Sequence, residues 1–425
     1  MIFSLGESRK MNNYSSYINR RQFMQMSAFW VVAGFYESNN LMAKSAPTIS
    51  LPFTKGTRQI VSAGTFPQKG ELILQRMRPP LLETPWSVFE NNIFTPNDMF
   101  YVRWHMPDFP LTVDVTSYRI KVFGEVDKPI EISLNELMHN FKPAEIAAVN
   151  QCAGNSRGFV EPRVPGAQWA HGAMGNAIWT GVTLKDLLAK ANVKTGATHV
   201  AFRSLENGME PFPPRTRFEK VLTLDHALDG EVMVAYAMNH EALPVLNGFP
   251  VRLVVPGWYS TYWVKMLTEI EVMNHPGTNY WMAKSYLIPD TPNGFVEPGA
   301  TCSKMVPVNK MNPRSFFTGI KNGAKLKVNQ TTVIHGIAFG GNTGLARVMF
   351  SSDSGATWQE TRLKFDYGKY SFRKWEIEFT PKKRKEYTLM VKAVNTDNEE
   401  QPMFGCWNFG GYMYNAIERI TVKAC

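Results

Sequence analysis

The chain has 425 residues, a formal net charge of +10, 44% apolar residues and 12% aromatic residues. This length and apolar content support two or three domains with cores of their own, and they exclude a disordered or linker-like protein. No apolar run reaches the ~20 residues of a membrane-spanning helix, so we expect no membrane span. The basic residues are scattered, apart from the run 382–385. An anionic substrate or an acidic redox partner is therefore expected rather than nucleic acid.

Residues 1–45 have the features of an export leader. Arg20 and Arg21 precede the apolar stretch Met26–Phe35, a pattern typical of a twin-arginine signal. The pattern predicts export of the folded protein to the periplasm. The alternative is an ordinary basic start to a cytosolic helix.

The next informative stretch is Phe94–Pro107, which follows a Pro- and Lys-rich region, 44–85, that we expect to lie extended on the surface. Its apolar and polar residues alternate, which predicts a strand with Arg103 and His105 on one face. A guanidinium beside an imidazole forms a site for an anion. The alternative is an exposed pair on an edge strand.

Short strands and helices alternate between residues 117 and 275 without a regular βαβ order. This mixture predicts an α+β domain. Ser133 is expected to cap one of the helices. The predicted elements are strands at 118–123, 198–203 and 251–255, and helices at 134–139, 184–191 and 225–228.

Cys152 follows the apolar run Ile146–Val149 and precedes a Gly-Asn-Ser turn, so it should lie where a buried strand opens into a loop. Arg157, five residues on, favours the thiolate, which is the form that attacks or binds a metal. The alternative is an inert buried thiol. The other cysteines fit no zinc or haem-attachment spacing, and a disulfide between two of them is left open: Cys302, Cys406 and Cys425.

A stretch rich in proline, glycine and asparagine, 276–314, predicts a domain boundary near residue 300. Beyond it, short strands and turns without helices predict an immunoglobulin-like β-sandwich. The predicted strands are 325–328, 331–338, 346–351, 374–379, 387–394 and 417–422. The predicted organisation is thus a leader at 1–45, a first domain at 46–300 and a sandwich at 301–425.

The segments Gln151–Phe159, Pro162–Trp169 and Gly172–Gly181 resemble the molybdenum-binding region of the sulfite oxidase family. They most resemble that of bacterial periplasmic sulfite dehydrogenases, and the resemblance runs from about residue 80 to the end. It implies that the first domain is a molybdopterin-binding catalytic domain and that the C-terminal sandwich forms a homodimer. It also implies that Cys152 is the protein ligand of a molybdenum that carries a pyranopterin dithiolene.

The resemblance implies roles for further residues. Trp104 replaces the asparagine of the family's Arg-Asn-His, and Glu206 and Asn247 stand where vertebrate relatives have aspartate and histidine. The residues implied at the substrate are Arg103, Arg157, Trp169, Tyr236 and Arg419. Those implied at the cofactor are Phe100, Tyr101, Arg103, His105, Cys152, Glu206, Asn247, Arg252, Trp263, Val264 and Lys265.

The implied activity is oxidation of sulfite to sulfate, with arginines holding the oxyanion. This sequence contains no haem-attachment motif, so electrons are expected to pass to a separate c-type cytochrome. Two related activities are alternatives: an exported molybdenum-dependent methionine sulfoxide reductase and a sulfane dehydrogenase. An alternative of another class is an exported adhesion or binding protein, which metal analysis would separate from the enzymes.

Overall fold

The computed structural model describes residues 47–207 and 217–425, which belong to one folded unit. The predicted leader, including Arg20 and Arg21, lies outside the described residues. In the part of the chain that the structure describes, no helix has the length and apolar character needed to cross a bilayer.

The central sheet carries Cys152 at the end of its edge strand. Its order is β13 (Glu241–Ala242), β12 (Met233–Met238), β9 (Met174–Thr183) and β8 (Ala144–Gln151), and β14 (Arg252–Val254) also pairs with β12. β8 and β9 are antiparallel along the whole length of β8, and the last four residues of β8 are buried. Because β8 ends at Gln151, the next residue, Cys152, enters a loop from a buried strand end. The predicted position of Cys152 is confirmed.

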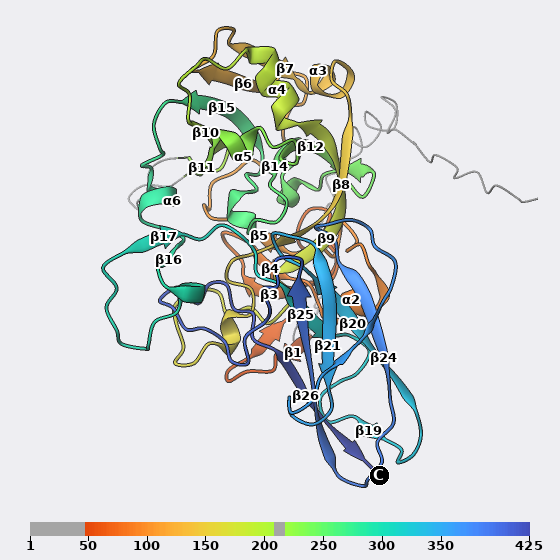
Figure 1. The fold of residues 1–425 in the computed structure, drawn as a ribbon. Coiled ribbons are helices and arrows are strands. Elements are labelled where there is room, and N and C mark those ends of the chain that lie inside the picture. Colours follow the sequence, from red (N-terminus) through yellow and green to blue (C-terminus); the bar gives the residue numbers. More distant parts are fainter. Residues whose placement is uncertain (1–46, 208–216) are drawn as a thin grey trace, which may run out of the picture. The chain divides into compact units, whose positions relative to one another are not determined.

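A second five-stranded sheet lies toward the other end of Figure 1 from the C-terminal strands. Its order is β11 (Glu219–Thr223), β10 (His199–Ser204), β15 (Leu267–Met273), β6 (Arg119–Gly124) and β7 (Ile130–Ser133), with β15 parallel to β6. The predicted Ser133 cap is confirmed, because α3 (Leu134–His139) begins with a capping box between Ser133 and Glu136. α4 (Leu184–Ala191) buries Leu184, Leu187, Leu188 and Ala191, which lie on one helical face.

The N-terminal region differs from the prediction. Residues 47–85 form β1 (Thr48–Ser50), β2 (Thr57–Gln59), β3 (Ile73–Arg76) and β4 (Leu81–Glu83), and β4 pairs with β5 (Val102–Arg103). Leu72 and Leu82 are fully buried and share a core with Val102 and Trp104. The described part of 44–85 is therefore extended and largely exposed up to residue 71, as predicted, but Leu72 and Leu82 of its later part belong to this buried core.

Short elements connect the sheets, and none of the described helices exceeds the eight residues of α4. The unit is thus more strongly β than the predicted α+β mixture. The remaining connecting elements are α2 (Ser87–Asn91), η1 (Arg157–Phe159), α5 (Leu224–Ala227), η2 (Val245–Asn247), η3 (Ser260–Tyr262), α6 (Tyr280–Ala283), β16 (Leu287–Pro289), η4 (Pro292–Gly294) and β17 (Met305–Pro307).

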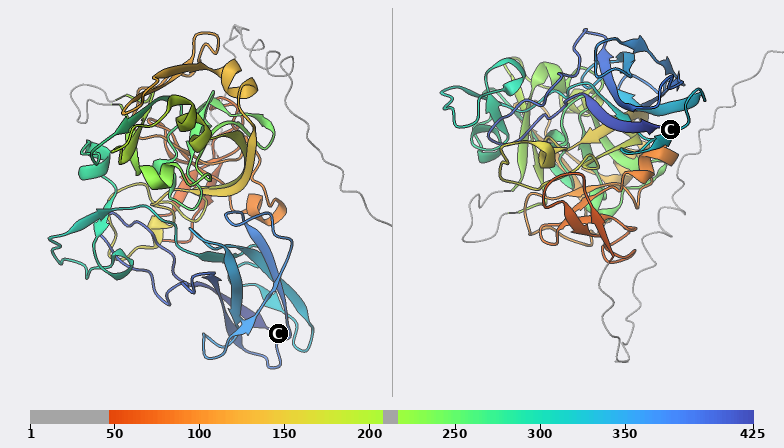
Figure 2. Two further views of the ribbon diagram at one scale, coloured as in Figure 1. Left: turned by 45° about the horizontal axis from the view of Figure 1, so that its top comes forward. Right: turned by 90° about the horizontal axis from the view of Figure 1, so that it is seen from below.

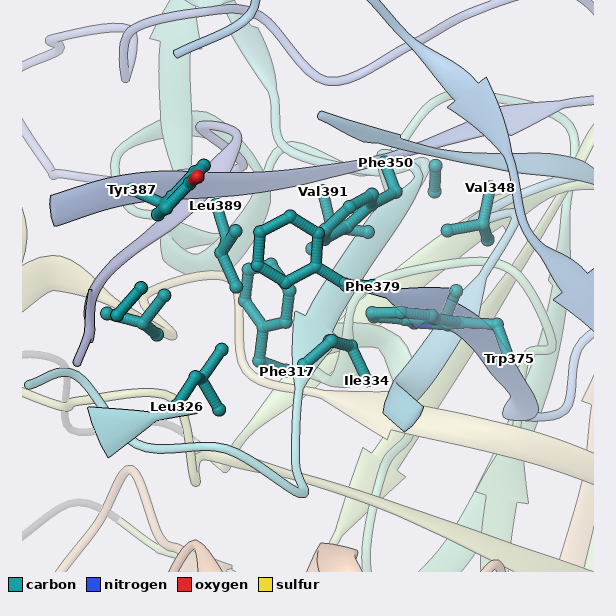
Figure 3. Packing of buried hydrophobic residues seen from close by; sticks show 14 residues of the cluster. Phe317, Leu326, Ile334, Val348, Phe350, Trp375, Phe379, Tyr387, Leu389 and Val391 are labelled. Atoms are coloured by element: carbon teal, nitrogen blue, oxygen red, sulfur yellow. The ribbon is translucent and has the colours of Figure 1, made fainter. Parts of the chain in front are cut away.

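The C-terminal strands form two sheets that share a core, gathered on one side in both views of Figure 2. One is β18 (Arg314–Phe317), β20 (Thr332–Phe339), β24 (Arg373–Phe379) and β23 (Arg362–Leu363). The other is β19 (Lys325–Leu326), β26 (Glu418–Ala424), β25 (Glu386–Asn395), β21 (Leu345–Ser351) and β22 (Gln359–Glu360). Figure 3 shows Phe317, Ile334 and Trp375 of the first sheet facing Phe350 and Val391 of the second. The six predicted strands correspond to β19, β20, β21, β24, β25 and β26.

Candidate active site

The Cys152 loop, defined here as residues 152–158, is held by its own backbone and by the segment that follows it. The amide of Cys152 donates to the carbonyl of Ala173 (2.9 Å), and the Asn155 side chain bonds Gln151 and the Ala173 amide. The Cys152 side chain is 5% exposed. The loop therefore places the Cys152 thiol at the buried end of β8, where backbone and side-chain hydrogen bonds hold the loop.

Arg157 is anchored within this loop. Its Nε donates to the carbonyl of Gly410 (2.7 Å) and its Nη1 to that of Ala167 (3.0 Å), and the guanidinium lies 5.2 Å from the Tyr412 ring centre. A Cβ on Gly154 would lie 2.3 Å from Nη2 of Arg157, so the glycine leaves room for the guanidinium. These contacts show that the segment around Gly410 and Tyr412 reaches the Cys152 loop.

Arg103 approaches the same place from β5. Its Nη1 is buried and has no hydrogen-bond partner among the described residues, and its guanidinium lies 5.6 Å from the Tyr286 ring centre. Burial acts to lower the pKa of Arg103, but the nearby acidic groups of Tyr286, Cys152 and Glu206 raise it overall. The pKa values of Tyr286 and Tyr412 are raised by burial and also respond to Cys152, Arg103 and Arg157. Arg103 and Arg157 therefore each contact one ring of a stacked pair of tyrosines, whose ring centres are 5.4 Å apart.

His105, Glu206 and Lys265 form a buried charged cluster. Oε1 of Glu206 accepts from the amides of His105 and Met106, and Oε2 lies 3.7 Å from Nζ of Lys265. Burial acts to raise the pKa of Glu206, but Lys265 and these hydrogen bonds lower it to about 2. Burial lowers the pKa of Lys265 to about 8 and that of His105 well below its ordinary range. At neutral pH the cluster therefore holds a carboxylate and a neutral imidazole.

A second buried cluster contains Asn247, Arg252 and Lys69. Asn247 accepts from Nζ of Lys69 (2.5 Å) and donates to the Tyr101 carbonyl (3.1 Å), while Lys69 also donates to the Phe100 carbonyl (3.0 Å). Arg252 donates to the carbonyls of Asn247 (2.8 Å) and Trp263 (3.2 Å). Burial lowers the pKa of Lys69 to about 7 and that of Arg252 to about 10.

The aromatic residues predicted at the site are buried, and several connect these clusters. The Tyr101 hydroxyl donates to Asn150 (2.6 Å), and its pKa is raised by burial and then by Cys152. Trp263 lies against Arg252 (5.7 Å), and the carbonyl of the neighbouring Val264 accepts from Leu253 (2.8 Å). The carbonyl of Trp169 accepts from Gly158 (3.0 Å), in the Cys152 loop.

Tyr236 lies in β12, where the register with β9 shifts between Ala235 and Ala237. Its side chain is 7% exposed. The register shift changes the alternation of side chains at this point of the strand. Its predicted contact with substrate stays a prediction.

Arg419 is not part of the site. Its side chain is exposed, donates to the Met403 carbonyl and lies 4.8 Å from the Phe404 ring centre. Successive strand residues face opposite sides, and the preceding residue of β26, Glu418, points inward to Arg314. The resemblance placed the correct segment near Cys152 but the wrong residue, because Gly410 and Tyr412 make the contacts with Arg157.

Three buried residues of the site region were missed by sequence reasoning. Lys69 lies in a region predicted to be surface, and Lys220 in β11 carried no motif. Tyr286 has φ of +57°, lies between Arg103 and Lys220, and followed no recognisable pattern. The lysines could not be found because a lysine is normally exposed, and only the tertiary structure buries it.

The clusters contain more buried cations than buried anions. The cations are Arg103, Arg252 and Lys265, joined by a partly charged Lys69, and the carboxylate among them is that of Glu206. Several buried polar atoms also have no partner among the described residues, namely Arg103 Nη1, His105 Nε2, Asn150 Nδ2 and Arg252 Nε. Buried charges and donors are costly unless paired. The arrangement therefore fits a polar anionic group bound beside Cys152.

Comparisons with known proteins define the class of this site. Residues 105–281 match the oxidoreductase molybdopterin binding domain, and residues 306–425 match the Mo-co oxidoreductase dimerisation domain. In residues 47–207 and 217–425, no three His, Cys, Asp or Glu side chains gather as a metal site. The fold and site are those of a molybdopterin-binding oxidoreductase.

The chain belongs to the sulfite oxidase family. It is 30% identical to sulfite oxidase of Gallus gallus over 89% of this chain and 81% of that protein. It is 32% identical to mitochondrial sulfite oxidase of Homo sapiens over 83% of this chain, and spans 65% of that relative's length. The sulfane dehydrogenase SoxCD of Paracoccus pantotrophus has the same fold, with a TM-score of 0.67, 22% identity, and coverage of 92% of this chain and 94% of that one.

The described residues fit a molybdenum–pterin cofactor. Cys152 offers a buried thiol, and the unpaired donors of Arg103 and Arg252, with the unpaired ring nitrogens of His105, suit the polar atoms and negative charge of a pterin phosphate. Arg252, Lys265, Asn247 and Glu206 were predicted at the cofactor, and the structure buries all four.

We expect Glu206→Gln to destabilise the protein at pH 7 by about 3–5 kcal/mol, because it leaves Lys265 buried without its carboxylate. The pKa of Glu206 is lowered to about 2, so its stabilisation is present above the unfolded pKa and is lost as pH falls through 2. Urea unfolding at pH 7 measures the loss. Glu269→Gln, whose carboxylate contacts the partly exposed Arg217 and Arg203, is the control and should cost less than about 1 kcal/mol. Equal losses in the two variants would contradict the prediction.

Proposed function

We propose that the protein oxidises sulfite to sulfate at a molybdenum–pterin centre bound through Cys152. The observation that carries the proposal is the position of Arg103, whose buried Nη1 has no partner among the described residues and whose guanidinium lies over Tyr286, which stacks on Tyr412, the ring that Arg157 contacts. A fixed guanidinium pair recognises an oxyanion by charge and by planar hydrogen-bond geometry. Membership of the sulfite oxidase family supports the substrate.

The chain's own residues bind, orient and enclose the substrate. The bound cofactor would supply oxygen transfer and take up two electrons. Arg103 and Arg157 would hold the oxygens of sulfite beside Cys152. Tyr286 and Tyr412, stacked on each other and placed over the two arginines, exclude water and strengthen these charge contacts. Tyr236 and Trp169 are proposed to complete the pocket.

A second candidate is oxidation of a sulfane sulfur. The observation that favours it is the placement of Arg419 outside the site, which removes one of the three predicted cations. A site with fewer cations is less specialised for the compact sulfite dianion than for a sulfane donor such as thiosulfate, whose two charges are spread over a larger anion.

Purified protein should contain about one molybdenum per chain and reduce ferricyanide in the presence of sulfite. Sulfite and thiosulfate should be compared as donors, with ferricyanide and cytochrome c as acceptors. Sulfite-dependent reduction of both acceptors supports the proposal and a c-type cytochrome as partner. Turnover of thiosulfate alone favours the second candidate, and protein grown with molybdate that contains no molybdenum overturns both.

We also propose that residues 301–425 form an immunoglobulin-like sandwich that makes a homodimer, following a catalytic domain at 46–300. The two sheets with a shared core and the match to a dimerisation domain support this. Light scattering should give twice the mass of one chain, which is 48.2 kDa before any leader is removed. A chain that stays monomeric at micromolar concentration contradicts the dimer.

The protein is further proposed to be periplasmic, exported in the folded state by the twin-arginine route. Replacing both Arg20 and Arg21 by lysine should leave active, unprocessed protein in the cytoplasm. Processed enzyme in the periplasmic fraction of this variant would contradict the proposal.

A further inference from the structure

Four polar side chains form a closed network between the Cys152 loop and the C-terminal sheets. Nη1 of Arg314 donates to Oγ of Ser156 (2.9 Å), which also bonds Nδ1 of His171 (2.8 Å). Nε2 of His171 lies 3.6 Å from Oε2 of Glu418, and Oε1 of Glu418 accepts from Nη2 of Arg314 (3.3 Å). Ser156 and His171 follow β8, whereas Arg314 and Glu418 begin β18 and β26.

The direction of each hydrogen bond follows from the groups present. Arg314 can only donate, so Ser156 accepts from it and has one proton left to donate. Burial lowers the pKa of His171 well below its ordinary range, so His171 is neutral. Nδ1 of His171 then accepts from Ser156, and its Nε2 proton points toward Glu418. Burial raises the pKa of Glu418 to about 7, against the opposing effect of Arg314, and above that pH the network holds one cation and one anion.

Arg314 and Ser156 are buried, and aromatic rings surround much of the network. Arg314 is 1% exposed and Ser156 is fully buried. The His171 ring stacks on Phe159 at 4.5 Å, and the Arg314 guanidinium lies 4.4 Å from the Phe316 ring centre. In such surroundings each hydrogen bond to a charged group is strong, and each lost partner leaves an unpaired polar group.

The arrangement contains a serine, a histidine and a carboxylate, but it is not a nucleophilic site. Oγ of Ser156 already accepts a hydrogen bond from Arg314, and the serine has no exposed surface. The contact of His171 with Glu418, at 3.6 Å, is longer than a hydrogen bond. The network therefore serves to hold Ser156, not to activate it.

Holding Ser156 fixes the backbone of the Cys152 loop. Ser156 has φ of +69°, a left-handed conformation that is unfavourable for a serine. Its amide donates to Ala170 (2.7 Å), and the amides of Asn155 and Arg157 donate to Cys152 (2.9 Å) and Gly154 (3.1 Å). An unfavourable conformation persists only when its surroundings impose it, and the side-chain restraint on Ser156 comes from Arg314 and His171.

We propose that Arg314 is a positioning residue that sets the conformation of the Cys152 loop, acting through Ser156, His171 and Glu418. The inference rests on the proposed role of Cys152 as a metal ligand but not on the identity of the substrate. The C-terminal sheets then contribute to the metal site by shaping its ligand loop, and loss of Arg314 loosens the loop without removing any ligand.

The test is amide hydrogen exchange of the purified full-length protein. In Arg314→Leu, the amides of Asn155, Ser156 and Arg157 should exchange roughly tenfold faster or more, since a charge-assisted hydrogen bond is lost. The amides of β25, in the core of the same C-terminal sheets, should exchange as in the wild type. The matched control is Arg362→Leu, because Arg362 lies in β23 of the same sheet as Arg314 but is 74% exposed and pairs with Glu376. It should leave the loop unchanged.

A second variant tests whether the effect of Arg314→Leu comes from the lost restraint on Ser156 or from leaving the Glu418 carboxylate buried without its cation. Arg314→Leu combined with Glu418→Leu leaves neither charge in the core and should fold even if Arg314→Leu alone does not. Its loop should still exchange faster, because Ser156 has lost its donor. Molybdenum per chain should fall about tenfold in both variants, as for other residues that support metal ligands. The proposal is overturned if the loop of the double variant exchanges as in the wild type, or if exchange accelerates equally in the loop and in β25. Wild-type protein without molybdenum would overturn the proposed function alone.

Discussion

Cys152→Ser is expected to lose molybdenum and at least ~100-fold in sulfite turnover, since residues that merely support a metal ligand already cost ~10–100-fold. Serine oxygen is a harder and poorer donor than thiolate for this metal. The fold should survive, because the contact that places residue 152 is its backbone amide bonded to Ala173. The measurements are molybdenum per chain, sulfite-dependent ferricyanide reduction and thermal unfolding of the same preparation.

Cys302→Ser is the matched control, because Cys302 is only partly buried and its thiol contacts the Lys304 carbonyl. It should retain wild-type molybdenum content and turnover. If Cys152→Ser kept more than a few per cent of wild-type turnover together with its molybdenum, the thiol would not be the metal ligand.

The local features of the fold could be predicted from the sequence. The end of β8 before Cys152 followed from a short apolar run and a turn, and the start of α3 at Ser133 followed from a capping pattern. These features depend on residues near one another in the chain. The six C-terminal strands were found for the same reason, because alternation and turn residues are local.

Features that depend on distant packing could not be predicted. Lys69 can be buried because its Nζ donates hydrogen bonds to Asn247, 178 residues later, and to two backbone carbonyls. Leu72 and Leu82 are buried because they meet Val102 and Trp104 of a later segment. Neither segment contains a sequence pattern that identifies the distant residues against which it packs.

Some features of the site could likewise be predicted from local sequence, whereas others depend on distant packing. The motif around Cys152 identified the loop, and the resemblance identified the C-terminal segment that reaches it. Which side chain of that segment faces inward depends on the phase of β26, and Glu418 takes the inward position through its contacts with Arg314 and His171. Successive strand residues face opposite sides, so Arg419 points outward, while Gly410 and Tyr412, which precede β26, make the contacts with Arg157.

Arg103→Ala should lower kcat/KM for sulfite by about 10- to 150-fold, the equivalent of losing one charge-assisted hydrogen bond of about 1.5–3 kcal/mol. The buried Nη1 of Arg103 has no partner in the described ranges and is the donor best placed for a substrate oxygen. If Arg103 only holds the substrate, KM should rise with kcat nearly unchanged, whereas a fall in kcat as well means that it stabilises charge in the transition state. Steady-state kinetics at low salt distinguish these outcomes.

Arg419→Ala is the matched control for this experiment, because it removes the same side chain from an exposed position on β26. Its kcat/KM should stay within about twofold of the wild type, since an exposed cation distant from the reaction is screened by solvent. A large loss in Arg419→Ala with none in Arg103→Ala would reverse the assignment and return the C-terminal arginine to the pocket. Parallel losses in both variants would mean that the long-range charge of the surface, and not a direct contact of Arg103, governs sulfite capture.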